Sequence, residues 1–451
     1  MSGGAGQPAE ILVRPAAEGA AAGAAARVLG RPVREWAERT RTELGLPAGP
    51  VVGAGHQPEW WHPGIVAKFA WADERARRTG ATLAWLVVDT DVRDPGGIRL
   101  PELRGGRLTA AEWRFAGTPS AGASPAGMPA SMPRALPEPR ADRAPALGCV
   151  ADGLVRAREA LQANARLPDA VAQVLAAVGA CTPEVGAPAH VLRTSSILAT
   201  GLGRALAAHA LADPCACARA FNRAVGMAPR TARPLAESGP QGAELPFWTP
   251  GPDGRRMRVH ADALGALLER GAPLWPRAFV TGLFARLALF DRFVHGTGGD
   301  AYERATDGLA ASWLGAALPP FDVATATLLL PFTDAAIDPG PGDAALRAAW
   351  FDPERGAHGG PGPRKRALLE EIASRPRGSE GRRAAWRRMH EALGSMREGR
   401  REELRRLEEA AAGARERARE HAVRSDRTWP AVLHPPEAIS RLASTIRSRP
   451  T

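Results

Sequence analysis

The chain has 451 residues, of which 45% are hydrophobic and 24% charged, the composition of a globular protein with two or three domains or one large elaborated domain. Its net charge of +11 is of the kind that nucleic-acid binders carry. Residues 361–451 hold 22 basic and 13 acidic residues, so this tail carries +9 and the rest of the chain only +2. Aromatic and basic residues are not interleaved, and a nucleic-acid partner is therefore not expected.

The four cysteines form no C-x-x-C pair, and no second Cys or His cluster completes a zinc site, so neither a metal site nor a disulfide is expected. The N-terminus lacks the basic and apolar stretches of a signal peptide. No run approaches the ~20 apolar residues that cross a bilayer. We expect a soluble cytoplasmic protein without a membrane partner.

Two stretches alternate between strand and helix patterns. In the first, Pro50–Gly55 is predicted as a strand, Ile65–Arg78 as a helix ended by Gly80, and Leu83–Val88 as a continuously apolar strand. Such strands are typical of parallel sheets buried on both faces. The second stretch predicts, in order, strand Arg277–Thr281, helix Leu283–Phe290, strand Arg292–His295, turn Gly296–Gly299, helix Ala301–Leu314 and strand Asp322–Leu330.

The rest of the chain completes an α/β fold with a Rossmann-like parallel-sheet core, helical insertions and a C-terminal coiled-coil or long-helix arm. Strand Ile11–Arg14, a helix around Val33–Leu44, helices over 151–225 and a hairpin of 244–248 with 255–260 are expected. The predicted segments are an N-terminal extension (1–48), the first half of the core (49–116), a Pro-rich loop insert (117–147), a mainly helical insertion (148–270), the second half of the core (271–335), a connecting segment (336–378) and the helical arm (379–451).

The arm has apolar residues at three- and four-residue spacing between about 379 and 424, with one eight-residue step. This pattern fits a heptad seam with a stutter, in one long helix or two. A homodimer through this coiled coil is one reading. A solvated amphipathic helix packed on the body of the protein is the other.

The loop after the first predicted strand contains the strongest candidate residues. Only two of the 59 basic residues are lysines, and one of them, Lys68, lies one helical turn past His56, His62 and Gly64. A helix start beyond a parallel strand is a seat for phosphate or carboxylate, histidines move protons near neutral pH, and a lysine supplies a compact cation. The structural alternatives are a solvent-facing lysine and histidines that cap the helix or pack on tryptophans.

Two aspartates, Asp89 and Asp91, close the second strand of the same unit, beside this loop. They are candidates for binding a substrate amine or Mg²⁺, or for general-base work. A turn held by Asx hydrogen bonds explains them equally well.

The second candidate loop lies in "RFVHGTGGDAYERATD", residues 292–307. Its strand, glycine turn and helix suit the approach of a nucleotide, although the sequence is neither a Walker loop nor G-x-G-x-x-G. Tight-turn glycines without a ligand are the alternative. The predicted cofactor-binding residues are Gly64, His295, Gly296, Gly298, Gly299 and Tyr302, the only tyrosine. Further candidates for substrate contact are Gln57, Arg193, Arg286 and Asp307. We expect both loops and the aspartates to open into one cavity.

Together these stretches resemble one family, the bacillithiol biosynthesis cysteine-adding enzymes. The resemblance is carried, in this order, by "GHQPEWWHPGIVAK", "AWLVVDTD", "PRAFVTGLFARLALFDRFVHGTGGDAYERATD" and "PPFDVATATLLLP", followed by the basic helical tail. The family's first motif usually reads T-G-Q-Q and its acidic strand end E-D-H-D, and neither is reproduced here. A divergent member is therefore indicated.

The resemblance implies a Rossmann-like core, a coiled-coil homodimer, a site for ATP or ADP with Mg²⁺, and a ligase that adds cysteine or a related amino compound to a small polar acceptor. His56, His62, Lys68, Asp89 and Asp91 are then the candidate catalytic residues. The alternative function is a non-catalytic dimeric scaffold or small-molecule-binding protein with a degenerate pocket.

Overall fold

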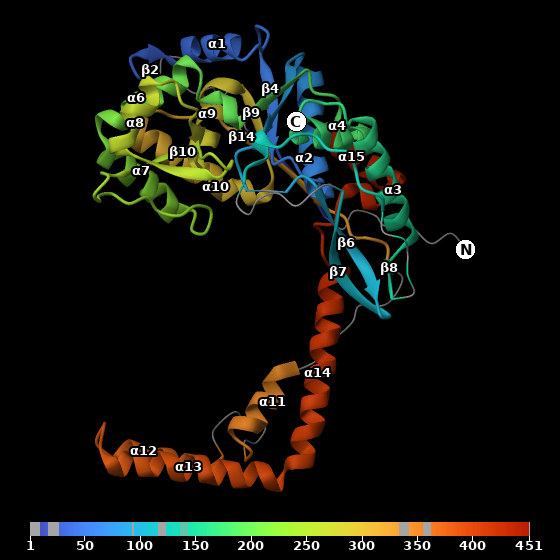
Figure 1. The fold of residues 1–451 in the computed structure, drawn as a ribbon, viewed down its shortest axis with the longest axis vertical. Helices are drawn as coiled ribbons and strands as arrows, with labels where there is room; N and C mark the ends of the chain where they lie inside the picture. The colour runs from blue at the N-terminus through green and yellow to red at the C-terminus, as the bar shows by residue number, and fades with distance from the viewer. Residues whose placement is uncertain are drawn as a thin grey trace. The chain divides into compact units, whose positions relative to one another are not determined.

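The computed structural model describes residues 10–16, 27–92, 94–115, 123–136, 138, 140, 142–332, 342–354 and 362–450 (Figure 1). The chain divides into two compact units. The first comprises Met1–Leu103, Ala110–Pro331 and Arg427–Thr451, and the second comprises Arg104–Thr109 and Phe332–Asp426. The C-terminal residues 427–451 thus belong to the first unit, which also contains the candidate loops.

A six-stranded sheet organises the first unit. Its order is β1 (Glu10–Arg14), β14 (Phe321–Thr327), β13 (Arg292–His295), β4 (Val51–His56), β5 (Thr82–Val87) and β9 (His190–Arg193). All neighbouring pairs are parallel except β1 with β14. The predicted α/β fold with a mostly parallel sheet is therefore confirmed. From β4, the next strands in the chain, β5 and β9, are added on one side of the sheet. The later strands β13 and β14 are added on the other side of β4, so the strand order reverses between β4 and β13.

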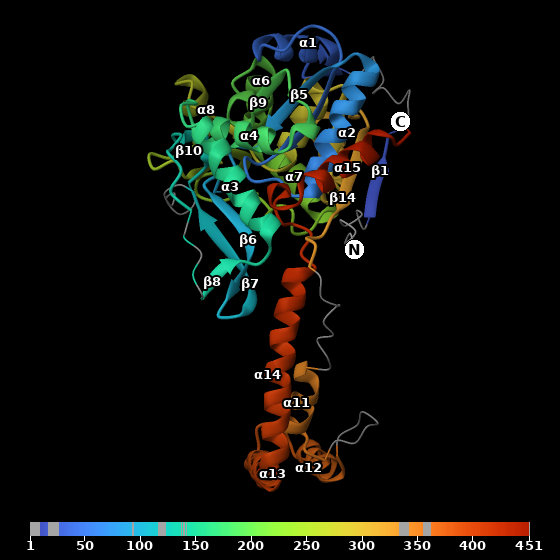
Figure 2. The same cartoon turned by 90° about the vertical axis from the view of Figure 1, so that its right-hand side faces the viewer.

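Helix α2 (Pro63–Thr79) covers one face of the sheet, as the first β-α-β pattern predicts. It ends at Gly80, whose positive φ of 63° suits a C-cap glycine. Trp61 stacks on Phe69 with ring centroids 4.1 Å apart, and Trp85 of β5 meets both rings edge-on at 5.0 Å. Helix α15 (Pro436–Arg447) packs on α2, and both views show the two helices side by side (Figure 2).

The opposite face of the sheet contributes Val51, Ala84, Leu86 and Phe293 to an extensive hydrophobic core. Helices from distant parts of the chain close over this core: α1 (Val33–Glu43), α6 (Gly201–Ala212), α7 (Pro214–Met227), α8 (Ala261–Glu269), α9 (Phe279–Phe284) and α10 (Thr297–Leu309). Short π-helical turns, Ala285–Leu289 and Ala310–Leu314, extend α9 and α10. Burial on both faces accounts for the nearly continuous apolar runs of β4 and β5.

The insertions add small sheets and helices to the first unit. The predicted hairpin is confirmed and gains a third strand. The elements are β2 (Arg27–Val28) with β3 (Arg31–Pro32), the sheet of β7 (Arg107–Arg114), β6 (Gly97–Arg104) and β8 (Arg143–Pro145), helices α3 (Gly148–Ala163), α4 (Ala170–Cys181) and α5 (Thr194–Ile197), and the sheet of β11 (Arg256–His260), β10 (Glu244–Pro250) and β12 (Trp275–Pro276).

The predicted strand Arg277–Thr281 is wrong. Only Trp275 and Pro276 pair with β10, and the backbone then turns sharply at Ala278, where φ is +43°. Helix α9 follows at once because Phe279 is buried against Phe221, with ring centroids 5.5 Å apart. The predicted glycine turn is also too long, since α10 begins directly after its N-cap residue, Gly296.

The described residues of the second unit form the helices α11 (Gly342–Phe351), α12 (Pro363–Ser374), α13 (Glu380–Gly399) and α14 (Arg401–Arg424). Helices α12 and α13 share a small core of Ile372, Ala385, Met389 and Leu393. The apolar pattern over about 379–424 therefore falls on two helices, separated at Arg400, while the last residues of the predicted arm, 427–451, belong to the first unit. Helix α11 packs against α14, so part of that helix is covered within one chain. Homodimerisation through these helices remains a prediction.

Nowhere in the described ranges is a helix both long and apolar enough to cross a membrane.

Two glycines provide a test of the packing around β4. A Cβ at Gly53 would lie 2.2 Å from the Phe290 ring, whereas a Cβ at Gly226 of α7 meets nothing within 4 Å. Gly53→Ala should lower the free energy of unfolding by about 1–3 kcal/mol because the core is overpacked. Gly226→Ala should be neutral or stabilising by about 0.5–1 kcal/mol because alanine favours the helix. Thermal and urea unfolding of both variants measure this, and equal stabilities would refute the tight packing.

Candidate functional site

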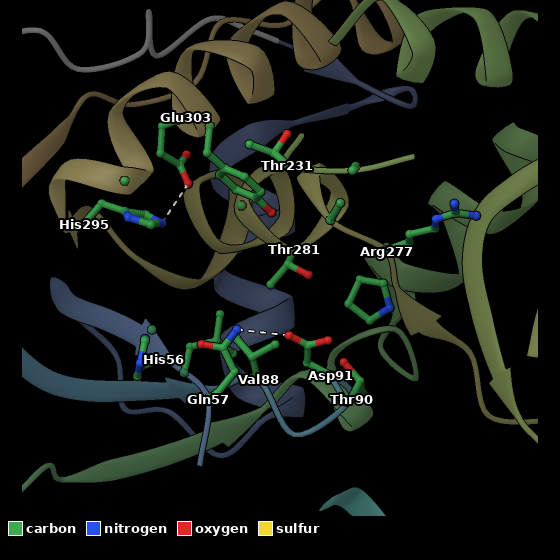
Figure 3. Close-up of a pocket in the computed structure, with 18 of the residues that line it drawn as sticks. His56, Gln57, Val88, Thr90, Asp91, Thr231, Arg277, Thr281, His295 and Glu303 are labelled. Atoms are coloured by element: carbon green, nitrogen blue, oxygen red, sulfur yellow. Dashed lines mark hydrogen bonds and ion pairs between the residues drawn. The ribbon is translucent and has the colours of Figure 1, made fainter. Parts of the chain in front are cut away.

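A cavity of about 850 Å³ opens at the carboxyl ends of β4, β5 and β13. This is the edge of the sheet where strand order reverses, the usual ligand position in open parallel sheets. Segments 55–57 and 88–91, Lys68 of α2, the starts of α9 and α10, the β10–β11 hairpin and residues 230–233 form its walls (Figure 3).

The cavity brings together residues from all three predicted stretches. The predicted site residues that line it are His56, Gln57, Lys68, Asp91, His295, Gly298 and Tyr302. The geometric part of the expectation is therefore met: the histidine loop, the aspartate-bearing strand end and the glycine bend all open into one cavity. Their catalytic and cofactor-binding roles remain predictions.

His62 and Gly64 do not line the cavity. His62 is the N-cap of α2, where its Nδ1 accepts a hydrogen bond from the Gly64 N–H at 3.1 Å. Burial lowers its pKa to about 4, so it stays neutral. A Cβ at Gly64 would lie 2.9 Å from Thr325 Oγ1 of β14. The start of α2 is thus packed against the sheet. Where the sequence predicts an anion-binding site, the His62 side chain caps the helix instead.

Asp89 is also absent from the cavity lining. Its carboxylate accepts hydrogen bonds from Ser195 Oγ at 2.6 Å, Ser195 N at 2.9 Å and Thr194 Oγ1 at 2.9 Å, and it is fully buried. Desolvation raises its pKa despite these bonds. Asp89 therefore ties the end of β5 to the end of β9, a structural role that its neighbour Asp91 does not share.

The other predicted contacts lie behind the cavity wall or away from it. Arg193 forms a two-pronged ion pair with Asp169 at 2.8 and 2.9 Å. Arg286 is buried and binds Asp307 at 2.8 Å. Gly299 has a packing role, since a Cβ there would lie 1.6 Å from His295 Nδ1, and Gly296 caps α10.

Lys68 is buried in the floor of the cavity with only 4% of its surface exposed. Its Nζ donates a hydrogen bond to the Gly55 carbonyl at 2.6 Å. Because burial penalises the ammonium form, the pKa of Lys68 falls to about 7. A solvent-facing lysine is therefore excluded, and the amine is poised to gain or lose a proton near neutral pH.

Glu303 of α10 is a site residue that the sequence analysis did not select. It has no exposed surface, and Arg286 Nη1 binds its Oε2 at 3.0 Å. Its Oε1 has no hydrogen-bond partner among the described residues and lies 3.7 Å from His295 Nε2 (Figure 3). Desolvation outweighs the neighbouring Arg286 and raises the pKa of Glu303 to about 7.

His295 completes this side of the cavity as a neutral ring. Burial and the nearby Lys68 and His56 lower its pKa to about 3, so the contact with Glu303 is no ion pair at neutral pH. Its Nδ1 accepts a hydrogen bond from the Gly296 N–H at 3.1 Å, which leaves the proton on Nε2, the nitrogen nearer Glu303. Burial also raises the pKa of Tyr302 well above 10, so its hydroxyl keeps its proton.

Arginines form the opposite part of the cavity, and none of these was selected from the sequence. The five are Arg230, Arg233, Arg256, Arg258 and Arg277. We call them the arginine wall. They were missed because arginine is abundant along the whole chain, so that the pairs in "RTARPL" and "RRMRVH" carry no distinct signal. The fold brings them together from three places: the segment after α7 supplies Arg230 and Arg233, β11 supplies Arg256 and Arg258, and Arg277 follows β12.

Asp91 pairs with a member of the arginine wall. Its Oδ1 binds Arg256 Nη1 at 3.2 Å, and its Oδ2 accepts a hydrogen bond from Gln57 Nε2 at 3.1 Å. Both oxygens are therefore engaged with protein partners, and the role of Asp91 toward Mg²⁺ or a substrate amine remains a prediction. Among the described residues, no group of three or more His, Cys, Asp or Glu side chains suits a metal ion.

The sequence matches no protein-family model and no curated protein. By its fold and its site, the protein is an α/β protein. Its arginine-lined cavity lies at the edge of a mostly parallel sheet, where the strand order reverses.

The titration of Lys68 can be observed directly because Lys365 is the only other lysine. In protein labelled with ¹³C at lysine Cε, one of two signals should titrate with a midpoint of about 7, and that signal should vanish in Lys68→Met. The folded-state pKa is below the unfolded one, so wild-type stability should rise with pH from about 7 to 10.5 relative to Lys68→Met. An ammonium that stays charged well into the alkaline range would contradict this.

Proposed function

We propose that this protein is an enzyme that forms a carbon–nitrogen bond, adding cysteine or a related amino compound to a small polar acceptor. The observation that carries the proposal is the convergence of Lys68, Glu303 and His295 with the arginine wall in one cavity. An amine and a carboxyl that both titrate near neutral pH are suited to proton transfer at pH 7.

The topology supports a Rossmann-like core. Numbered by their order along the chain, the parallel strands run 3-2-1-4-5 from β9 to β14, which is the order of the first five strands in Rossmann folds. The four stretches that resemble the cysteine-adding enzymes form β4 and α2, β5, the segment from β12 to α10, and β14. All of them surround the cavity or form the sheet beneath it.

The proposed chemistry assigns a separate task to each side of the cavity. An amine that attacks an acyl group must lose a proton, and the acceptor we propose is Glu303 Oε1, which has no hydrogen-bond partner among the described residues. When protonated, Lys68 balances the negative charge of a ligand bound at the floor of the cavity. Tyr302 keeps its proton and remains a hydrogen-bond donor. His56, whose Nε2 lies 3.0 Å from Glu59 Oε1, is the remaining candidate for proton exchange with solvent.

The cavity also bears on the proposed nucleotide. The arginine wall offers guanidinium donors for phosphate oxygens, so ATP or ADP fits the residues present. Such a group would supply activation of the acyl carbon. Asp91, whose oxygens bind Arg256 and Gln57, is the carboxylate of the cavity that we propose would face Mg²⁺ bound with the nucleotide.

A comparison of low-molecular-weight thiols in strains with and without the gene tests the reaction. Deletion should remove one thiol and accumulate its precursor. The wild-type gene and Lys365→Met should restore the thiol, while Lys68→Met and Glu303→Gln should lower its production by about 10²-fold or more. An unchanged thiol profile on deletion would reject this reaction and favour the non-catalytic binding protein.

The two histidines of the first loop form a matched pair for the same assay. His62→Ala removes an N-cap and should lower the free energy of unfolding by about 1 kcal/mol with thiol production retained. His56→Ala should leave stability nearly unchanged and reduce production. Thermal unfolding and thiol analysis of both variants distinguish these roles, and the opposite pattern would reject the assignment.

A further inference from the structure

The arginine wall carries more positive charge than its surroundings neutralise. Arg277 is 6% exposed and pairs with the buried Glu244, which also lies 3.6 Å from Arg258. Arg256 pairs with Asp91. Five guanidinium groups therefore face two carboxylates, an excess of three positive charges at one side of a cavity.

Two members of the wall have no carboxylate at all. Among the described residues, the side chains of Arg230 and Arg233 form no ion pair or hydrogen bond, and both are exposed at the cavity. Arg230 has a positive φ of 73°, a conformation that costs of order 1–3 kcal/mol for a residue other than glycine. The chain thus holds an uncompensated guanidinium at the cavity by a strained turn.

Two guanidinium groups of the wall stack on one tryptophan. Arg277 Cζ lies 4.5 Å and Arg256 Cζ 5.0 Å from the centroid of the Trp248 ring. Such stacking leaves the edges of the guanidinium groups free to donate hydrogen bonds. Figure 3 shows Arg277 on the other side of the cavity from His295 and Glu303. A ligand bound to the wall can therefore extend toward the titrating groups.

We propose that the arginine wall binds a pyrophosphate group, two linked phosphoryl groups carried by the substrate or cosubstrate of this site. A single carboxylate or phosphate would engage one or two guanidinium forks and leave the remaining charge unbalanced. Linked phosphoryl groups supply several charged oxygens along a line, which matches donors from buried Arg277 to exposed Arg230 and Arg233. This inference deepens the proposed function and rests on it only for the reaction that the ligand undergoes.

Calorimetric titration of the full chain with inorganic pyrophosphate tests the proposal. The double variant Arg230→Gln with Arg233→Gln should bind pyrophosphate at least 10-fold more weakly, at unchanged thermal stability, because neither side chain has a partner to lose. The control is Arg255→Gln, an exposed arginine beside β11 that forms an ion pair with Asp253 and is not among the residues that line the cavity. It should bind pyrophosphate like the wild type.

Citrate provides the comparison with carboxylates. The proposal predicts that pyrophosphate binds more tightly than citrate and that the double variant removes this preference. Citrate binding equally well or better, no pyrophosphate binding to the wild type, or equal losses in Arg255→Gln and the double variant would each overturn it.

Lys68→Met separates this inference from the proposed reaction. It should keep pyrophosphate binding within a few fold while abolishing thiol production. A wild-type protein that binds pyrophosphate through the wall, in a strain whose thiols do not depend on the gene, would reject the reaction and retain the binding site. Thiol production that depends on the gene, without pyrophosphate binding that depends on the arginine wall, would retain the reaction and reject the binding site.

Discussion

The reversal of strand order beside β4 is the constraint on which the rest of the first unit depends. Because β5 and β13 flank β4 and run parallel to it, their carboxyl ends lie at one edge of the sheet. The loops after β4 and β13 are more than 200 residues apart in the chain, yet both open into the same cavity. Lys68, Asp91 and His295 meet there because backbone pairing brings their strands together.

Burial then shifts the pKa values of the titratable side chains in the cavity. The same desolvation that lowers the pKa of Lys68 to about 7 raises that of Glu303 to about 7, since each loses solvation of its charged form. Arg286 binds one oxygen of Glu303, and within the described part of the chain the other oxygen has no hydrogen-bond partner. Glycines permit this close packing, because a side chain at Gly299 would displace His295 and one at Gly282 would lie 2.9 Å from Glu303 Oε1.

Neighbouring residues with the same side chain have different tasks because only one of each pair reaches the cavity. Asp89 fastens β9 to β5, and Asp91 organises Arg256 and Gln57. His62 caps α2, and His56 lines the cavity. The turn that follows β5 separates the two aspartates, and the N-cap geometry of α2 separates the two histidines. Neither is visible in the spacing of the residues alone.

The sequence by itself determined the elements whose patterns are local. The apolar run of β5, the β-α-β unit around α2, Gly80 as its C-cap and the rarity of Lys68 could all be read from neighbouring residues. Tertiary structure alone decided the helix at Phe279, the selection of Glu303 and the arginine wall. These depend on contacts between different elements: Phe279 of α9 with Phe221 of α7, Glu303 of α10 with Arg286 and His295, and the arginines that line the cavity with the sheet edge. A local pattern carries no record of such contacts, and in an arginine-rich chain it carries no sign of which arginines share a cavity.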